Sequence, residues 1–188
     1  MASYDRELLE AARTLIARQP GARGRLPRAK VRRSLSTAYY ALFHFLLEEA
    51  SRTVIGTTNV LSRRRRIFAR LFTHRGLLTA LTKIRGQAVE ESVADFLRGP
   101  ATAPGAFPAP VFARDMALAF QDAQTKRHDA DYDLNKPMTA EDAALLIDRV
   151  DAAITGWRQA GSEEEKDFKR ALSLLMLMKG QLRREEGA

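Results

Sequence analysis

The stretch that decides the fold is VRRSLSTAYYALFHFL, residues 31–46. From Val31 to Leu46 its apolar side chains recur at intervals of three and four residues, which is the spacing of one helix face. We expect this helix to run on to about Val54, because the Gly-Thr-Thr-Asn cluster at 56–59 then breaks it. The sequence therefore predicts a long amphipathic helix in its first third.

Helical spacing recurs through the rest of the chain, and no segment alternates as a strand would. Thr139 with Asp142 and Ser162 with Glu165 have the spacing of capping boxes, so each pair is expected to open a helix. The expected helices cover about residues 4–18, 31–54, 67–84 (as one helix or as two joined near 73–76), 112–128, 140–157 and 163–182. The chain is thus predicted to be all-α, a single-domain helical bundle of about five to seven helices.

A proline-rich segment interrupts the helices at residues 99–110. Its four prolines remove backbone donors and fix φ, so we expect a loop. The apolar content on either side is too small for two separate cores, so the loop is expected to be an excursion from one domain. We assign residues 1–160 to the bundle and residues 161–188 to a C-terminal helical extension.

The charge is uneven along the chain. The formal net charge of +8 divides into +11 over residues 1–99, with 19 Lys and Arg against 8 Asp and Glu, and −3 over residues 100–188, with 12 against 15. A basic surface attracts polyanions, because each cation that neutralises a nucleic-acid phosphate releases counterions. The basic half therefore suits contact with RNA. The alternative is a basic surface that serves only solubility.

The cysteine and histidine content disfavours several kinds of chemistry. The chain has no cysteine, so it can form no disulfide and use no thiol nucleophile. Its histidines, His44, His74 and His128, lack the spacing of metal ligands, and we expect no metal site and no cofactor. The N-terminus lacks the apolar core of a signal peptide, and no apolar run approaches the roughly 20 residues of a bilayer span. We therefore expect a cytoplasmic protein without membrane contact.

Residues 124–134, QTKRHDADYDL, bring together more side chains suited to catalysis than any other short segment of the chain. Arg127 brings a guanidinium that can grip phosphate through two bonds, and His128 brings an imidazole that titrates near neutrality. The Asp131 carboxylate can orient either group, and Tyr132 adds a hydroxyl. We expect these four side chains to form a catalytic, phosphate-handling site. The alternative is that Arg127 and His128 only end a helix, where the helix dipole favours basic side chains.

At two stretches the sequence resembles the HEPN superfamily, small all-α bundles found widely in bacteria and archaea. The resemblance rests on Arg33-Ser34 through Phe43-His44 in the long helix, and on Arg127-His128 through Asp131-Tyr132-Asp133. It implies a bundle over about residues 4–158, a homodimer and, for active members, a metal-independent endoribonuclease. It also implies a toxin or antiphage-defence setting, with a nucleotidyltransferase or another defence-system subunit as protein partner.

The ribonuclease motif of that superfamily has an arginine, a polar residue and, after a short spacer, a histidine. Arg127 matches the arginine and His128 the polar residue, whereas Tyr132 stands at the position of the histidine. A tyrosine of ordinary pKa is a poor base at neutral pH, so His128 or Asp131 would have to take the ribose 2′-hydroxyl proton. The resemblance leaves two hypotheses: an RNA-binding protein that cuts RNA, and a non-catalytic adaptor whose dimer groove binds a protein partner or a nucleotide.

Six arginines outside the motif are the predicted RNA contacts. They would position the phosphate backbone without reading its sequence. The run at 63–66 covers about a full helical turn, so its side chains cannot all line one groove, and the alternative is a solvated, basic helix start. The six are Arg32, Arg33, Arg63, Arg64, Arg65 and Arg66.

Overall fold

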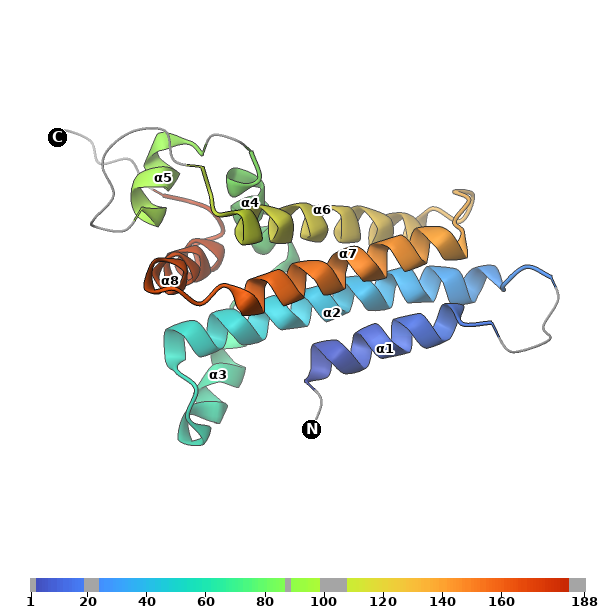
Figure 1. Ribbon diagram of the computed structural model, residues 1–188, viewed down its shortest axis with the longest axis horizontal. Helices are drawn as coiled ribbons and strands as arrows, with labels where there is room; N and C mark the ends of the chain where they lie inside the picture. The colour runs from blue at the N-terminus through green and yellow to red at the C-terminus, as the bar shows by residue number, and fades with distance from the viewer. Residues whose placement is uncertain (1–2, 19–23, 87–88, 99–107, 183–188) are drawn as a thin grey trace. The chain divides into compact units, whose positions relative to one another are not determined.

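The computed structural model describes residues 3–18, 24–86, 89–98 and 108–182, and this part of the chain is all-α, without a strand (Figure 1). In chain order its elements are α1 (Tyr4–Ile16), α2 (Arg28–Ile55), the 3₁₀ turn η1 (Asn59–Leu61), α3 (Ser62–Ala69), α4 (His74–Ile84), α5 (Glu91–Leu97), α6 (Val111–Tyr132), α7 (Ala140–Gln159) and α8 (Glu163–Leu177). None of these helices combines the length and hydropathy that a transmembrane span requires. The predicted all-α class is confirmed for these residues.

The long α2 and both capping boxes match the prediction. α2 is followed by Gly56, whose φ of +104° lies in the left-handed region that glycine adopts most readily. The hydroxyl of Thr139 accepts the N–H of Asp142 (3.1 Å), and the hydroxyl of Ser162 accepts that of Glu165 (3.2 Å). In both pairs the carboxylate accepts the N–H of the capping residue in return, at 2.9 Å. The sequence signals for these helix boundaries are therefore local.

The structure decides one alternative and differs from the expected helices at one place. Residues 67–84 fall into two helices, as one of the two expected arrangements has it, because Thr73 accepts the N–H of Gly76 (3.0 Å) and opens α4. The seven-residue α5 was not predicted, because fewer than two turns are too short to show a helical period. The part of the chain that the structure describes therefore holds eight α-helices, above the five to seven expected. Residues 99–107 of the expected loop lie outside the described residues.

The helices form two compact units. Unit 1 comprises the described residues of Met1–Phe45 and Leu118–Thr155, and unit 2 comprises those of Leu46–Ala117 and Gly156–Ala188. The helices α2, α6 and α7 each contribute residues to both units.

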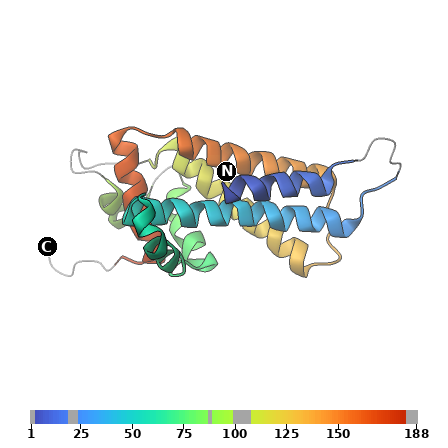
Figure 2. The ribbon, with the colours of Figure 1, turned by 90° about the horizontal axis from the view of Figure 1, so that it is seen from below.

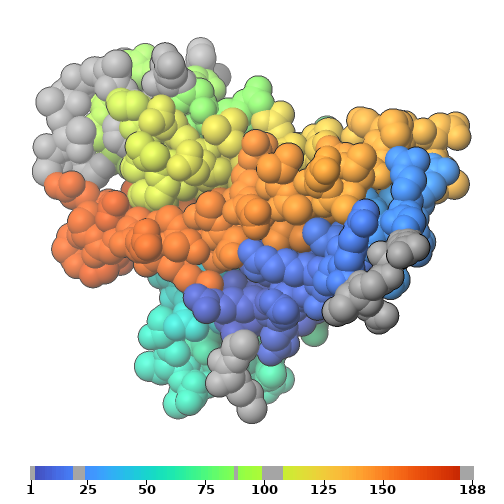
Figure 3. Space-filling view, turned by 45° about the vertical axis from the view of Figure 1, so that its right-hand side comes forward, coloured from blue at the N-terminus to red at the C-terminus, as the bar shows by residue number. Residues whose placement is uncertain are grey.

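In unit 1, α1 lies beside α2 and α7 (Figures 2 and 3). Arg13 of α1 pairs with Asp151 of α7, with Nη2 and Oδ2 2.7 Å apart. The Ser34 hydroxyl of α2 donates to the buried carbonyl of Ala12 (2.8 Å). The core of this unit is built from buried apolar side chains of all four helices: Leu9, Ala12, Leu35, Tyr39, Leu42, Phe120, Ala123, Leu146, Ile147, Val150 and Ile154.

Arg32 ties the end of α6 to α2. Its guanidinium donates to four backbone carbonyls at 2.8–3.1 Å, those of Asp129, Ala130, Asp133 and Lys136. The last carbonyls of a helix have no partner inside that helix, so a side chain that binds them stabilises the final turn. This cap explains why α6 reaches Tyr132, whereas the sequence pattern placed its end near Arg127 or His128. The prediction of that helix end was wrong.

His44 lies on α2 beside Tyr4 of α1. The two ring centroids are 5.2 Å apart in an edge-to-face arrangement, and the Phe43 ring lies 5.6 Å from His44. Burial lowers the pKa of His44 from its usual value of 6.5, because the charged imidazolium loses hydration there. His44 therefore packs as a neutral ring in the aromatic cluster of unit 1.

In unit 2, the chain that follows α8 passes close to α4. Gly180 has a φ of +69°, and its N–H donates to the carbonyl of Leu175 (2.8 Å), which closes the end of α8. A Cβ atom on Gly180 would lie 3.2 Å from the backbone nitrogen of Ala80 in α4. Both the left-handed backbone and this close approach therefore require glycine.

The buried Lys169 of α8 joins the end of α7 within unit 2. Its Nζ donates to the carbonyls of Trp157 (2.7 Å) and Ala160 (2.5 Å). The ammonium also lies 5.4 Å from the ring centroid of Phe112 and 5.5 Å from that of Trp157. Burial lowers its pKa, and these carbonyls and rings offset part of that cost.

Gly180→Ala is expected to lower the free energy of unfolding by about 1–3 kcal/mol, because alanine is strained at positive φ and meets the α4 backbone. Gly156→Ala is the matched control. Gly156 lies inside α7 with open space where a Cβ would be, so alanine there should stabilise the protein by up to about 1 kcal/mol. Urea unfolding of both variants checks this, and changes of the same sign would contradict it.

The pH dependence of stability should carry the signature of His44. The folded state binds a proton at His44 less readily than the unfolded chain, so stability should fall as the pH drops below 6.5 and level off below the folded pKa. His44→Phe keeps a ring in the cluster and should flatten this part of the curve. Unfolding measured across this pH range tests it, and identical slopes for wild type and variant would refute the assignment.

Candidate functional site

The predicted site residues Arg127 and Asp131 meet on α6, one helical turn apart. The Nε of Arg127 is 2.8 Å from Oδ2 of Asp131, in the arrangement of an ion pair rather than a straight hydrogen bond. The other oxygen, Oδ1 of Asp131, accepts the Ser36 hydroxyl of α2 at 2.6 Å. Both charged side chains are mostly shielded, with 23% of Arg127 and 31% of Asp131 exposed. Asp131 therefore orients Arg127 and is itself fixed by α2.

Three tyrosine rings surround the guanidinium of Arg127. Its Cζ atom is 5.7 Å from the ring centroid of Tyr39, 5.6 Å from that of Tyr40 and 5.9 Å from that of Tyr132. The Nη2 group also donates to the Tyr40 hydroxyl at 3.3 Å. Aromatic faces attract a guanidinium and restrict its motion. We call Ser36, Tyr39, Tyr40, Arg127, Asp131 and Tyr132 the Arg127 cluster.

The electrostatics of the Arg127 cluster favour a permanent cation beside a protonated Tyr39. Partial burial disfavours the charged guanidinium, but attraction to Tyr40, Asp131 and Tyr132 outweighs it, so the pKa of Arg127 is raised above its usual value. Burial raises the pKa of Tyr39 well above its ordinary range, although Arg127 opposes this. Tyr39 therefore stays protonated and contributes a packed ring rather than a base.

The predicted residues His128 and Tyr132 lie on the outer side of the same turn of α6. His128 is exposed, and its ring centroid is 5.1 Å from that of Tyr132, which is 66% exposed. The structure thus places all four predicted site residues within two turns of one helix. Arg127 and Asp131 are held by α2, while His128 and Tyr132 face solvent.

The six predicted RNA-contacting arginines divide into capping and exposed side chains. Arg32 caps α6, and Arg65 donates from Nη1 to the carbonyls of Gly56 (2.8 Å) and Thr58 (2.9 Å) after α2. The remaining four are exposed: Arg33 in unit 1, and Arg63, Arg64 and Arg66 in unit 2. Arg32 and Arg65 therefore have structural roles that the charge pattern did not indicate.

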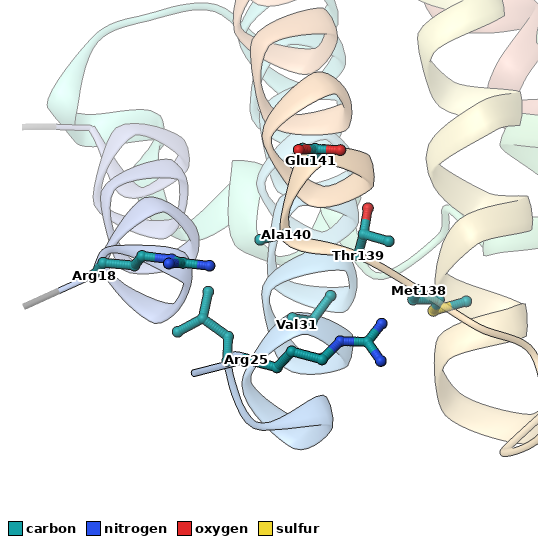
Figure 4. Close-up of a pocket in the computed structure, with 8 residues that line it drawn as sticks. Arg18, Arg25, Val31, Met138, Thr139, Ala140 and Glu141 are labelled. Atoms are coloured by element: carbon teal, nitrogen blue, oxygen red, sulfur yellow. The ribbon is translucent and has the colours of Figure 1, made fainter. Parts of the chain in front are cut away.

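A separate pocket of about 210 Å³ lies in unit 1, between the end of α1 and the starts of α2 and α7 (Figure 4). Its ionisable side chains are Arg18, Arg25 and Glu141, and the Thr139 hydroxyl on its wall already caps α7. Apolar side chains form the rest of its lining: Leu26, Val31, Met138 and Ala140. The pocket lacks an imidazole, so we place the candidate site at the Arg127 cluster.

Within the described ranges, no three His, Cys, Asp or Glu side chains gather in a way that could hold a metal ion. Comparison of the chain with protein-family models, with curated proteins and with solved structures found no match.

Asp131→Ala is expected to lower the free energy of unfolding by about 1–2 kcal/mol, because it leaves the partly buried Arg127 unpaired and removes the acceptor of Ser36. The matched control is Asp148→Ala, whose carboxylate is 73% exposed and 3.6 Å from Arg13, and which should change stability by less than about 0.5 kcal/mol. Chemical unfolding of both variants measures the difference. Equal, small losses would show that the ion pair does not organise the cluster.

Proposed function

We propose that this chain is a HEPN-type RNA-binding protein that contacts a phosphate of the RNA backbone through Arg127. A metal-independent endoribonuclease activity, in a toxin or antiphage-defence setting, is part of the proposal. The observation that carries it is the fixed guanidinium of Arg127, with the exposed His128 beside it in the chain.

The hydrogen-bonding capacity of Arg127 supports phosphate contact. A guanidinium has five N–H donors. The Nε–H of Arg127 is buried in the ion pair with Asp131 and one Nη2–H donates to the Tyr40 hydroxyl, which leaves three Nη N–H groups without a partner in the described part of the chain. A phosphate accepts two such donors side by side. Because the tyrosines and Asp131 already restrict the guanidinium, binding would cost little conformational entropy.

Cleavage would need two proton transfers beside that phosphate. The 2′-oxygen bonds to phosphorus as its proton passes to a base, and the bond from phosphorus to the 5′-oxygen breaks as that oxygen takes a proton from an acid. The products are a cyclic phosphate and a 5′-hydroxyl. His128, next to the Arg127 cluster, is the imidazole that could make either transfer, since Tyr132 stands where the family motif has its histidine.

A homodimer would complete this chemistry. Acid–base cleavage uses one group that accepts a proton and another that donates one. A single chain supplies one Arg127 and only one imidazole, that of His128, beside it. A two-fold axis beside the cluster would bring a second copy of each side chain to the same phosphate. The exposed Tyr132 gives such a contact an aromatic side chain.

The second candidate function is a non-catalytic adaptor that binds a protein partner, such as a nucleotidyltransferase or another defence-system subunit, or a nucleotide. The observation that favours it is the pairing of Arg127 with Asp131, because this carboxylate offsets the positive charge that a phosphate would meet. An exposed tyrosine and histidine on one helix turn also suit a protein contact.

The test is the binding and cleavage of labelled RNA in EDTA by wild type and Arg127→Gln. Loss of one phosphate contact should weaken binding at least tenfold, lower the slope of log K against log salt by about one, and abolish any cleavage. Arg149→Gln is the matched control. It also removes an ion-paired arginine, with Nη1 2.6 Å from Asp122, but lies on α7 outside the cluster.

His128→Ala separates binding from chemistry. This exposed residue can be replaced with little effect on folding, so the variant should bind RNA and lose cleavage. If the Arg127→Gln variant is folded and binds RNA as tightly as wild type does, the phosphate contact is ruled out. RNA that wild type neither binds nor cuts at any concentration would leave the adaptor as the remaining function.

A further inference from the structure

Aliphatic side chains are exposed along the segment from η1 to the turn after α3. Val60 is 91% exposed, Ile67 56% and Leu71 54%. Val60 lies in η1, Ile67 in α3 and Leu71 in the turn that follows, so three exposed aliphatic side chains fall within twelve residues of the chain. Isolated exposed apolar residues are ordinary, but three so close together in the chain suit contact with an apolar partner.

Four exposed arginines lie between and beside these aliphatic residues in the chain. Arg63, Arg64, Arg66 and Arg70 are exposed, and none forms an ion pair within the part of the chain that the structure describes. Between residues 50 and 89 the sequence holds nine Lys and Arg and no Asp or Glu, so no acidic neighbour along the chain offsets this charge. We call the three aliphatic residues and these four arginines the α3 surface.

We propose that the α3 surface binds an anionic phospholipid bilayer. Each guanidinium can donate two hydrogen bonds to a lipid phosphate, and a basic segment is drawn to anionic headgroups. The aliphatic side chains can then enter the boundary between headgroups and acyl chains. Such a segment lies on the membrane and needs no spanning helix, so the lack of an apolar span in the sequence does not oppose it.

Two other occupants fit the α3 surface less well. RNA would match the arginines, but nucleic-acid surfaces use exposed aromatic rings for base stacking. The exposed apolar residues here are aliphatic, and the nearby rings of Phe68 and Phe72 contact each other at 5.4 Å, with Phe72 buried. A second copy of the chain docked on the same face would bring like charges together. An anionic bilayer matches both the charge and the apolar side chains.

The experiment is flotation of the full chain with vesicles of phosphatidylcholine alone and with phosphatidylglycerol added. Wild type should float with the anionic vesicles and stay behind with the neutral ones. Removing three arginines should lower the partition coefficient roughly 100-fold, at about fivefold each. Removing the aliphatic side chains should lower it at least about tenfold. The variants are Arg63→Gln/Arg64→Gln/Arg66→Gln and Val60→Ser/Ile67→Ser/Leu71→Ser.

Matched controls remove equal numbers of exposed arginines and exposed leucines from unit 1 and should float as wild type does. They are Arg6→Gln/Arg18→Gln/Arg25→Gln and Leu118→Ser/Leu134→Ser/Leu145→Ser. Equal losses in controls and α3 variants would overturn the proposal, because they would assign binding to net charge. Failure of wild type to float would also overturn it.

Labelled RNA, added to the same variants, distinguishes the two polyanions. If the arginine variant loses RNA binding while the aliphatic variant keeps both RNA and vesicle binding, the α3 surface is an RNA surface and the bilayer proposal is wrong. The inference does not depend on Arg127, so Arg127→Gln should float as wild type does whatever its effect on RNA.

Discussion

The cap that Arg32 places on α6 is the constraint on which the candidate site depends. One planar guanidinium here binds two carbonyls of the last turn of α6, those of Asp129 and Ala130, and two in the turn that follows, those of Asp133 and Lys136. The cap keeps residues 127–132 helical, and only in a helix do Arg127 and Asp131 lie one turn apart on the same side. It also holds this turn against α2, where Ser36 and Tyr40 complete the contacts of Asp131 and Arg127. Arg32, which the sequence predicts to contact RNA, thus holds the helix turn that carries the candidate site.

The Arg127 cluster has a structural role, to which the proposed function adds a chemical one. Its ion pair and tyrosine contacts link α2 to α6, so part of the cost of burying a guanidinium is offset inside the protein. The same contacts restrict the guanidinium, which is what a preformed phosphate contact requires. The exposed side of the cluster differs, because His128 and Tyr132 are free to meet a ligand or a partner chain. The last turns of α6 therefore combine side chains held by α2 with side chains exposed to solvent.

Features that depend on neighbouring residues could be predicted from the sequence. The apolar spacing predicted α2, and the capping boxes predicted the starts of α7 and α8. The long-range contacts could not be predicted in this way. Arg32 binds carbonyls about 100 residues away, and nothing near it in the sequence distinguishes it from the exposed Arg33. Ser36, Tyr40 and the buried Lys169 likewise take their roles from partners on other helices.

The central claim is that Arg127 is a fixed cation with donors left for a phosphate. Nitrogen-15 NMR of the arginine Nε–H groups tests it most directly, with the Arg127 signal assigned by its loss in Arg127→Lys. In the free protein this proton should exchange with water more slowly than those of exposed arginines, because Nε is buried against Asp131. A short RNA should then shift the Arg127 signal, and at the same concentration inorganic phosphate should shift it much less. A rapidly exchanging signal, or one that RNA leaves unchanged while other arginines shift, would contradict the account.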